Sequence, residues 1–155
     1  MATFKALLLE NIAANKGETT DVGCTLEELS LADLKKETGD TLVAIDYSTL
    51  NYKDALAVTN RVKIARRLPM IPGIDFAGTV LETTPESRLS VGDKVLMNGY
   101  GLSEDHWGGF SELAYVDSAK LLPLAQNMST HEAMAYGTAG YTAALSVLAL
   151  LEHQV

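Results

Sequence analysis

The stretch Leu50-Asn51-Tyr52-Lys53-Asp54 separates a predicted strand from a predicted helix. Before it, apolar side chains alternate with others over residues 41–47, which is the period of a half-buried strand. After it, the Ala-Leu-Ala sequence of residues 55–57 favours a short helix. The stretch therefore places an amide, a phenol, an ammonium group and a carboxylate at a strand-to-helix turn, where a rigid element can direct them into a cleft.

A structural role would account for the same residues. Asn51 can act as the N-cap of the predicted helix with Asp54 at position N3, a variant of the capping box worth about 1 kcal/mol. A functional role would instead use these side chains for binding or proton transfer. The stretch alone leaves both interpretations open.

The composition is that of one acidic domain. Of the 155 residues, 47% are hydrophobic, which is enough for a core. Twelve basic residues against 20 acidic ones give a formal charge of −8, which argues against a nucleic-acid partner. Cys24 is the single cysteine, so the sequence excludes an intrachain disulfide and a cysteine cluster for zinc.

The sequence predicts a cytoplasmic protein with no membrane partner. The residues after Met1 lack the basic start and the cleavage pattern of a signal peptide. The longest apolar run, residues 143–151, is shorter than the roughly 20 residues that cross a bilayer.

Short strands with turn signals about every ten residues are typical of a β-barrel or sandwich. Residues 11–25 are predicted as a loop or irregular hairpin, and residues 26–36 are ambiguous between a strand opening and a helical turn. The predicted strands are residues 4–9, 41–47, 74–81, 94–97, 110–116 and 121–124.

The last part of the chain reads as helix. Ser129 and Glu132 resemble a helix start, and residues 140–153 are almost continuously helix-forming with apolar side chains on every face. Such helices are buried on all sides, whereas a barrel covers only one side, so we expect a further partner for this helix. We predict a barrel domain over residues 1–128 and a helical linker over residues 129–155.

Three motifs carry a resemblance to a known superfamily: Asn51-Tyr52-Lys53-Asp54, Pro-Gly-Ile-Asp-Phe-Ala-Gly at 72–78 and Gly-Thr-Ala-Gly-Tyr-Thr-Ala at 137–143. From residue 4 to about residue 151, the chain resembles the N-terminal catalytic half of zinc-independent medium-chain dehydrogenases/reductases. Within them it is most similar to the acrylyl-CoA reductase group, often labelled quinone oxidoreductase.

The resemblance implies a fold that is mainly β with α (α+β). It is a GroES-like β-barrel catalytic domain with C-terminal linking helices. Members of the superfamily are about twice this length, and their second half is a Rossmann domain. No Gly-x-Gly-x-x-Gly motif occurs here, so we expect a truncated form, a fragment or half of a split protein that is inactive alone.

The resemblance also implies the absence of a metal. Zinc-dependent relatives carry His-Glu after the Pro-Gly of the second motif, where this chain has Ile74 and Asp75. A branched alkyl group cannot ligate zinc. His106, His131 and His153 lie far apart in sequence and show no paired-ligand spacing.

The implied reaction is hydride transfer from NADPH to the β-carbon of an activated double bond, followed by protonation of the α-carbon. The substrate would be acrylyl-CoA or another enoyl, enone or quinone compound, and the full-length relatives imply a homodimer. The substrate carbonyl becomes enolate-like in the transition state, so the site needs hydrogen-bond donors directed at that oxygen.

Candidate roles follow for four residues. Asn51 would position the substrate carbonyl or the cofactor amide, and Tyr52 would line the cleft, contact the cofactor and donate a hydrogen bond or proton. Asp54 would orient its neighbours, since a free aspartate with a pKa of about 3.9 is a weak base. Thr138 would contact the nicotinamide, because Gly137 and Gly140 allow close approach.

The proton donor stays open. Related enoyl reductases carry a tyrosine donor several residues beyond the motif aspartate, near Val62 here, and valine cannot donate a proton. Tyr52, a water molecule or another group would have to serve.

Residues 60–68 are basic in an otherwise acidic chain. Arg61, Lys63, Arg66 and Arg67 form either a solvated loop or an anchor for the phosphates of a CoA ester. A second function class is also open. A GroES-like barrel could be a non-catalytic binding or assembly module that associates through its apolar C-terminal helix.

Overall fold

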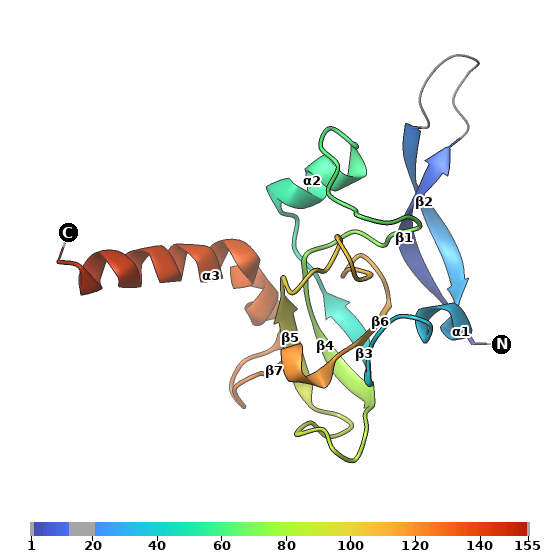
Figure 1. The fold of residues 1–155 in the computed structure, drawn as a ribbon. Coiled ribbons are helices and arrows are strands. Elements are labelled where there is room, and N and C mark those ends of the chain that lie inside the picture. The colour runs from blue at the N-terminus through green and yellow to red at the C-terminus, as the bar shows by residue number, and fades with distance from the viewer. Residues whose placement is uncertain (1, 13–20, 155) are drawn as a thin grey trace.

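The computed structural model describes residues 2–12 and 21–154 (Figure 1). The strands are β1 (Thr3–Ile12), β2 (Asp21–Ser30), β3 (Thr41–Tyr47), β4 (Asp75–Glu82), β5 (Lys94–Asn98), β6 (Leu113–Val116) and β7 (Leu122–Pro123). The helices are α1 (Leu31–Leu34), α2 (Tyr52–Val58), the 3-10 helix η1 (Ser118–Lys120) and α3 (Thr130–Glu152). The prediction of a mainly β fold with few helices is confirmed.

Two antiparallel sheets form the body of the molecule. Five strands pair in the order β6-β3-β4-β5-β7, and β1 pairs with β2 in a separate hairpin. The chain just before β6 joins the two sheets, because the amide of Leu7 donates to Phe110 O and that of Glu112 donates to Lys5 O, both at 2.9 Å. The predicted strand over residues 110–116 is therefore shorter than expected, since Phe110 bonds to β1 and Glu112 divides its backbone bonds between Lys5 of β1 and Ile45 of β3.

Of the two alternatives predicted for residues 11–25, a loop or an irregular hairpin, the described residues follow the hairpin. Asn11 and Ile12 belong to β1, and residues 21–25 belong to β2, with Leu9 opposite Cys24 and Asn11 opposite Val22. The polar sequence left both alternatives open because β2 is largely exposed, and the ladder stabilises an exposed strand without apolar alternation. Residues 13–20 lie outside the described residues.

The ambiguous segment over residues 26–36 contains both predicted elements. It begins as the end of β2 and turns into α1, where Ser30 is the N-cap and its hydroxyl accepts from the amide of Asp33 at 3.1 Å.

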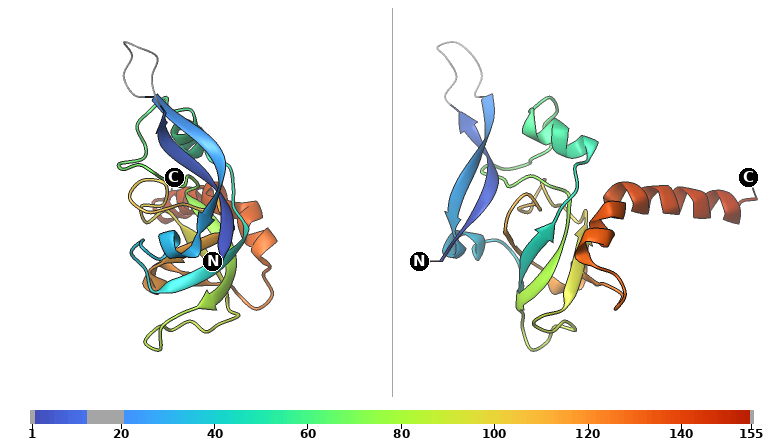
Figure 2. Two further views of the ribbon diagram at one scale, coloured as in Figure 1. Left: turned by 90° about the vertical axis from the view of Figure 1, so that its right-hand side faces the viewer. Right: turned by 180° about the vertical axis from the view of Figure 1, so that it is seen from behind.

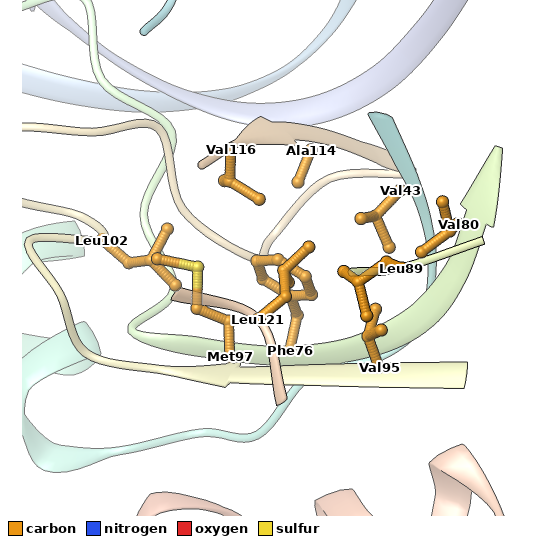
Figure 3. Close-up of a cluster of buried hydrophobic side chains, with 10 residues drawn as sticks. All are labelled: Val43, Phe76, Val80, Leu89, Val95, Met97, Leu102, Ala114, Val116 and Leu121. Carbon is orange, nitrogen blue, oxygen red and sulfur yellow. The ribbon is translucent and has the colours of Figure 1, made fainter. Parts of the chain in front are cut away.

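The main core lies on one face of the five-stranded sheet (Figure 3). Phe76 is fully buried among Val43, Met97 and Leu121. Gly78 lets β3 and β4 approach closely, because a Cβ at this position would lie 2.0 Å from the carbonyl oxygen of Ala44. The core therefore fixes β4, whose first residue is Asp75, against β3.

Helix α3 begins with the predicted capping box. The hydroxyl of Ser129 accepts from the amide of Glu132 at 3.1 Å, and the Glu132 carboxylate accepts from the amide of Ser129 at 2.8 Å. Gly137 interrupts the helix with φ 53° and ψ −161°. The turns before this kink bury Ala133 and Met134 against the sheet.

After the kink α3 projects away from the sheets, on the side opposite the β1–β2 hairpin (Figures 1 and 2). Its apolar side chains are exposed, with Leu148 60% and Leu151 68% accessible. The expectation that the barrel would cover one side of this helix is wrong beyond the first turns, because the kink directs the helix outward.

By length and composition alone, α3 is a candidate membrane span, which for one helix is weak evidence. The kink leaves about 15 residues in the straight part, roughly 22 Å at 1.5 Å per residue. That length is below the roughly 30 Å of a bilayer core.

Candidate active site

A fully buried carboxylate, that of Asp75, accepts hydrogen bonds from three residues in two other segments of the chain. Thr49 donates to it through its amide at 3.0 Å and through its hydroxyl, at 2.8 and 2.6 Å from the two oxygens. Asn51 donates through its side-chain amide at 3.2 Å. Thr138 donates through its amide at 3.0 Å and its hydroxyl at 2.6 Å. We call Asp75, Thr49, Asn51 and Thr138 the Asp75 cluster.

The fold explains why these residues meet. Asp75 opens β4, Thr49 and Asn51 lie in the turn between β3 and α2, and Thr138 follows the kink of α3. Gly137 makes the approach possible, since a Cβ there would lie 2.7 Å from Cγ2 of Thr49 and its φ is positive. The kink therefore brings the amide and hydroxyl of Thr138 onto the carboxylate.

The Asp75 carboxylate determines which groups of the cluster donate hydrogen bonds and which accept them. A carboxylate can only accept hydrogen bonds, so the Thr138 hydroxyl must donate its single proton to Asp75. The same oxygen accepts from Nδ2 of Asn98 at 3.1 Å, which leaves one lone pair. Nδ2 of Asn51 donates to the hydroxyl oxygen of Thr49 at 3.0 Å as well as to Asp75. The amide donors of Asn51 are thus engaged within the protein.

Asp54 lies beside this cluster and is also fully buried. Its carboxylate accepts from the backbone amide of Asn51 at 2.8 Å and from that of Ile74 at 3.0 Å. Burial raises the pKa of Asp54, and the nearby Asp75 carboxylate acts in the same direction. The predicted capping box of Asn51 and Asp54 is present. In addition, the bond to Ile74 ties the start of α2 to the strand that carries Asp75.

Tyr52, the first residue of α2, adjoins the cluster in sequence and is 82% exposed. The structure thus brings together Asn51, Asp54 and Thr138 of the predicted site and leaves Tyr52, the residue after Asn51, exposed to solvent. Their catalytic and cofactor-binding roles stay predictions.

The basic segment lies elsewhere, against acidic side chains. Arg66 pairs with Glu104 at 3.3 Å and with Asp105 at 3.1 Å, and Arg67 pairs with Glu37. Lys53 of α2 also pairs with Glu104, so α2 and the basic segment share one carboxylate.

A cavity of about 560 Å³ opens along the basic segment, with Lys63, Arg66 and Arg67 in its lining. Arg61 is exposed and is not part of that lining. The segment does not contribute to the Asp75 cluster, and its predicted role in substrate binding stays a prediction.

Sequence reasoning missed Asp75, Thr49 and Asn98 as members of the site. The signal for Asp75 was the placement of one carboxylate between Ile74 and Phe76 in a strand that is otherwise apolar. A buried charge at such a position requires several donors. Thr49 and Asn98 carried no comparable signal, because only the tertiary fold brings them to Asp75 and Thr138.

Among residues 2–12 and 21–154, no group of three or more His, Cys, Asp and Glu side chains is placed to hold a metal ion.

The site thus joins a kinked helix to the five-stranded sheet at a buried carboxylate. The chain belongs to the alcohol dehydrogenase GroES-like domain family, which matches residues 37–126. The acrylyl-CoA reductase AcuI of Ruegeria pomeroyi is 45% identical over 150 residues, covering 97% of this chain and 43% of that protein. The putative quinone oxidoreductase YhfP of Bacillus subtilis is 44% identical over 144 residues, covering 93% of this chain and 41% of that protein.

A solved structure agrees with these relatives. Escherichia coli K-12 YhdH with bound NADPH superposes with a TM-score of 0.85 at 44% identity. The superposition covers 97% of this chain and 44% of that one. The chain therefore spans less than half the length of the relatives it matches.

Proposed function

We propose that the chain is the catalytic domain of an NADPH-dependent oxidoreductase that reduces the activated C=C bond of acrylyl-CoA or a similar enoyl, enone or quinone substrate. The observation that carries the proposal is the Asp75 cluster, which joins residues of all three motifs at one carboxylate, in a chain 45% identical to an acrylyl-CoA reductase. We further propose a cytoplasmic homodimer.

The residues fit a nicotinamide cofactor. Such a cofactor supplies the hydride when bound. The remaining lone pair of Thr138 can accept from the amide group of a nicotinamide.

Tyr52 supplies the donor that the substrate carbonyl needs. Its phenol is exposed and Tyr52 directly follows Asn51 of the cluster, so it can donate to an oxygen that gains negative charge in the transition state. Asp54 holds the start of α2, and thereby the position of Tyr52, through its bonds to Asn51 and Ile74.

The first experiment measures the intact mass of the natural protein and assays the same sample for NADPH consumption with acrylyl-CoA. A mass near twice the 16.6 kDa of this chain, with turnover, supports the reductase. In the active protein, Tyr52→Phe should lower turnover more than tenfold, about 1.4 kcal/mol, without loss of folding. Tyr115→Phe on β6 is the matched control and should leave turnover unchanged. Full turnover in Tyr52→Phe would remove Tyr52 from the site.

A second candidate function is a non-catalytic assembly module, favoured by the exposed apolar part of α3. A natural mass of 16.6 kDa without turnover would favour it over the reductase.

A further inference from the structure

We propose that Asp75 is a positioning residue for this reaction, an inference that rests on the proposed function. Its carboxylate takes the hydroxyl proton of Thr138, so that the Thr138 oxygen presents an acceptor, and not a donor, to the amide group of the bound nicotinamide.

Burial excludes a direct role for Asp75. Its side chain is fully buried, so it cannot touch a substrate in the cleft. The donors to its side chain are neutral amides and hydroxyls from Thr49, Asn51 and Thr138. Any influence on catalysis must therefore pass through these neighbours.

Asp75 fixes Thr138, like Thr49, through both its backbone and its side chain. Oδ2 of Asp75 accepts both the amide and the hydroxyl of Thr138, at 3.0 and 2.6 Å, so one oxygen orients the backbone and the side chain together. Nδ2 of Asn98 approaches the Thr138 hydroxyl from another direction at 3.1 Å. The Thr138 oxygen donates its proton to Asp75 and uses one lone pair to accept from Asn98. Its remaining lone pair can therefore only accept a hydrogen bond.

The kink at Gly137 explains why Thr138, and not another threonine of α3, bonds to Asp75. Thr138 follows Gly137, whose φ of 53° and ψ of −161° break the helix and turn the amide of Thr138 away from the helical ladder. One turn later, Thr142 donates its hydroxyl to the carbonyl of Thr138 within the helix, a local bond outside the Asp75 cluster. Thr142 is thus a matched control for Thr138.

A double-mutant cycle in the natural NADPH-oxidising protein tests the proposal. Asp75→Asn and Thr138→Val should each lower kcat by about tenfold or more. The double variant should be about as slow as Thr138→Val alone, because Asp75 acts through the hydroxyl that valine lacks. Thr142→Val should keep wild-type kcat. Thr138→Ser, which keeps the hydroxyl, should recover most of the activity that Thr138→Val loses.

Thermal unfolding of each variant, recorded alongside, gives the folded fraction to which kcat is normalised. Multiplicative losses in the double variant, or a normalised kcat for Asp75→Asn equal to that of the wild type, would overturn the positioning role and leave the proposed function intact.

A second readout does not depend on activity. In amide NMR spectra of the chain, Asp75→Asn should move the resonances of Thr138 and Thr49 strongly and that of Thr142 little. If the wild type consumes no NADPH but these resonances move as expected, the proposed function fails while the hydrogen-bond arrangement stands. Unmoved Thr138 and Thr49 resonances would overturn the arrangement itself.

Discussion

The hydroxyl of Thr138 donates to the carboxylate of Asp75 at 2.6 Å, across 63 residues of sequence. This bond joins the first residue of β4 to the kink of α3, and the same carboxylate binds Asn51 at the start of α2. The two helices that carry the motif residues are therefore held at fixed positions relative to one strand of the central sheet.

Gly137→Ala should destabilise the protein by about 1–3 kcal/mol, because its backbone conformation strains any other residue and its Cβ would lie 2.7 Å from Cγ2 of Thr49. Urea unfolding measures the loss. Gly140→Ala is the control, within about 1 kcal/mol of the wild type, since Gly140 is helical and its Cβ would meet only Tyr136, an exposed side chain. Equal losses in the two variants would contradict a special role for the kink.

Gly78→Ala should cost about 3 kcal/mol or more, because a Cβ would lie 2.0 Å from the carbonyl oxygen of Ala44 in the paired strand β3. Gly99→Ala is the comparison variant, because it introduces backbone strain without a steric clash. Gly99 has a φ of 73° but nothing within 4 Å of a Cβ, so its variant should lose only about 1–2 kcal/mol. Denaturant unfolding measures both losses from the shift in midpoint, provided that the slope m is unchanged. A smaller loss at Gly78 than at Gly99 would show that β3 can shift.

The pKa of Asp54 is raised from its ordinary value of 3.8. As the pH rises from about 3.8 through this raised pKa, the unfolding free energy of the wild type should fall relative to that of Asp54→Asn. The folded state binds this proton more tightly than the unfolded state, so ionisation of the buried carboxyl costs stability in that interval. The variant will itself be less stable, because one amide oxygen replaces two carboxylate oxygens that accept from Asn51 and Ile74.

Asp40→Asn provides the control of opposite sign. Burial acts to raise the pKa of Asp40, but hydrogen bonds from Ser118 and Thr41 together lower it. Its contribution to stability is therefore present above its ordinary pKa and is lost as the pH falls through the lowered pKa. Unfolding free energies measured from pH 3 to 7 should show the two wild-type-minus-variant differences changing in opposite directions. Parallel changes would contradict the assignment for Asp54.

Lys63→Gln tests whether the basic segment binds phosphates. Lys63 lines the cavity of about 560 Å³ beside Arg66 and Arg67. In the active protein the variant should raise KM for a CoA ester about threefold, or ~0.7 kcal/mol, and leave KM for an uncharged quinone unchanged. Lys35→Gln, whose side chain pairs with Glu82, is the control. Equal changes for both substrates would remove Lys63 from phosphate binding.

Periodicity predicted most strands because the buried faces of β3, β4 and β5 carry apolar side chains, and the N-caps at Asn51 and Ser129 marked two helices. The hairpin could be predicted only as an alternative to a loop, because pairing with β1, and not apolar alternation, stabilises β2. The motifs pointed to Asn51, Asp54 and Thr138 and also contain Asp75, but the bonds from Asn51 and Thr138 to its carboxylate depend on tertiary contacts, which no local pattern of residues records.

The separation of Asp75 from Thr138 also sets an order of events on the ribosome. At about 5–20 residues per second, synthesis reaches Thr138 roughly 3–12 s after Asp75. During that interval the chain already made offers the carboxylate only the donors of Thr49 and Asn51 from the Asp75 cluster. The glycine kink arrives later and brings the two donors of Thr138 that complete the coordination of this anion.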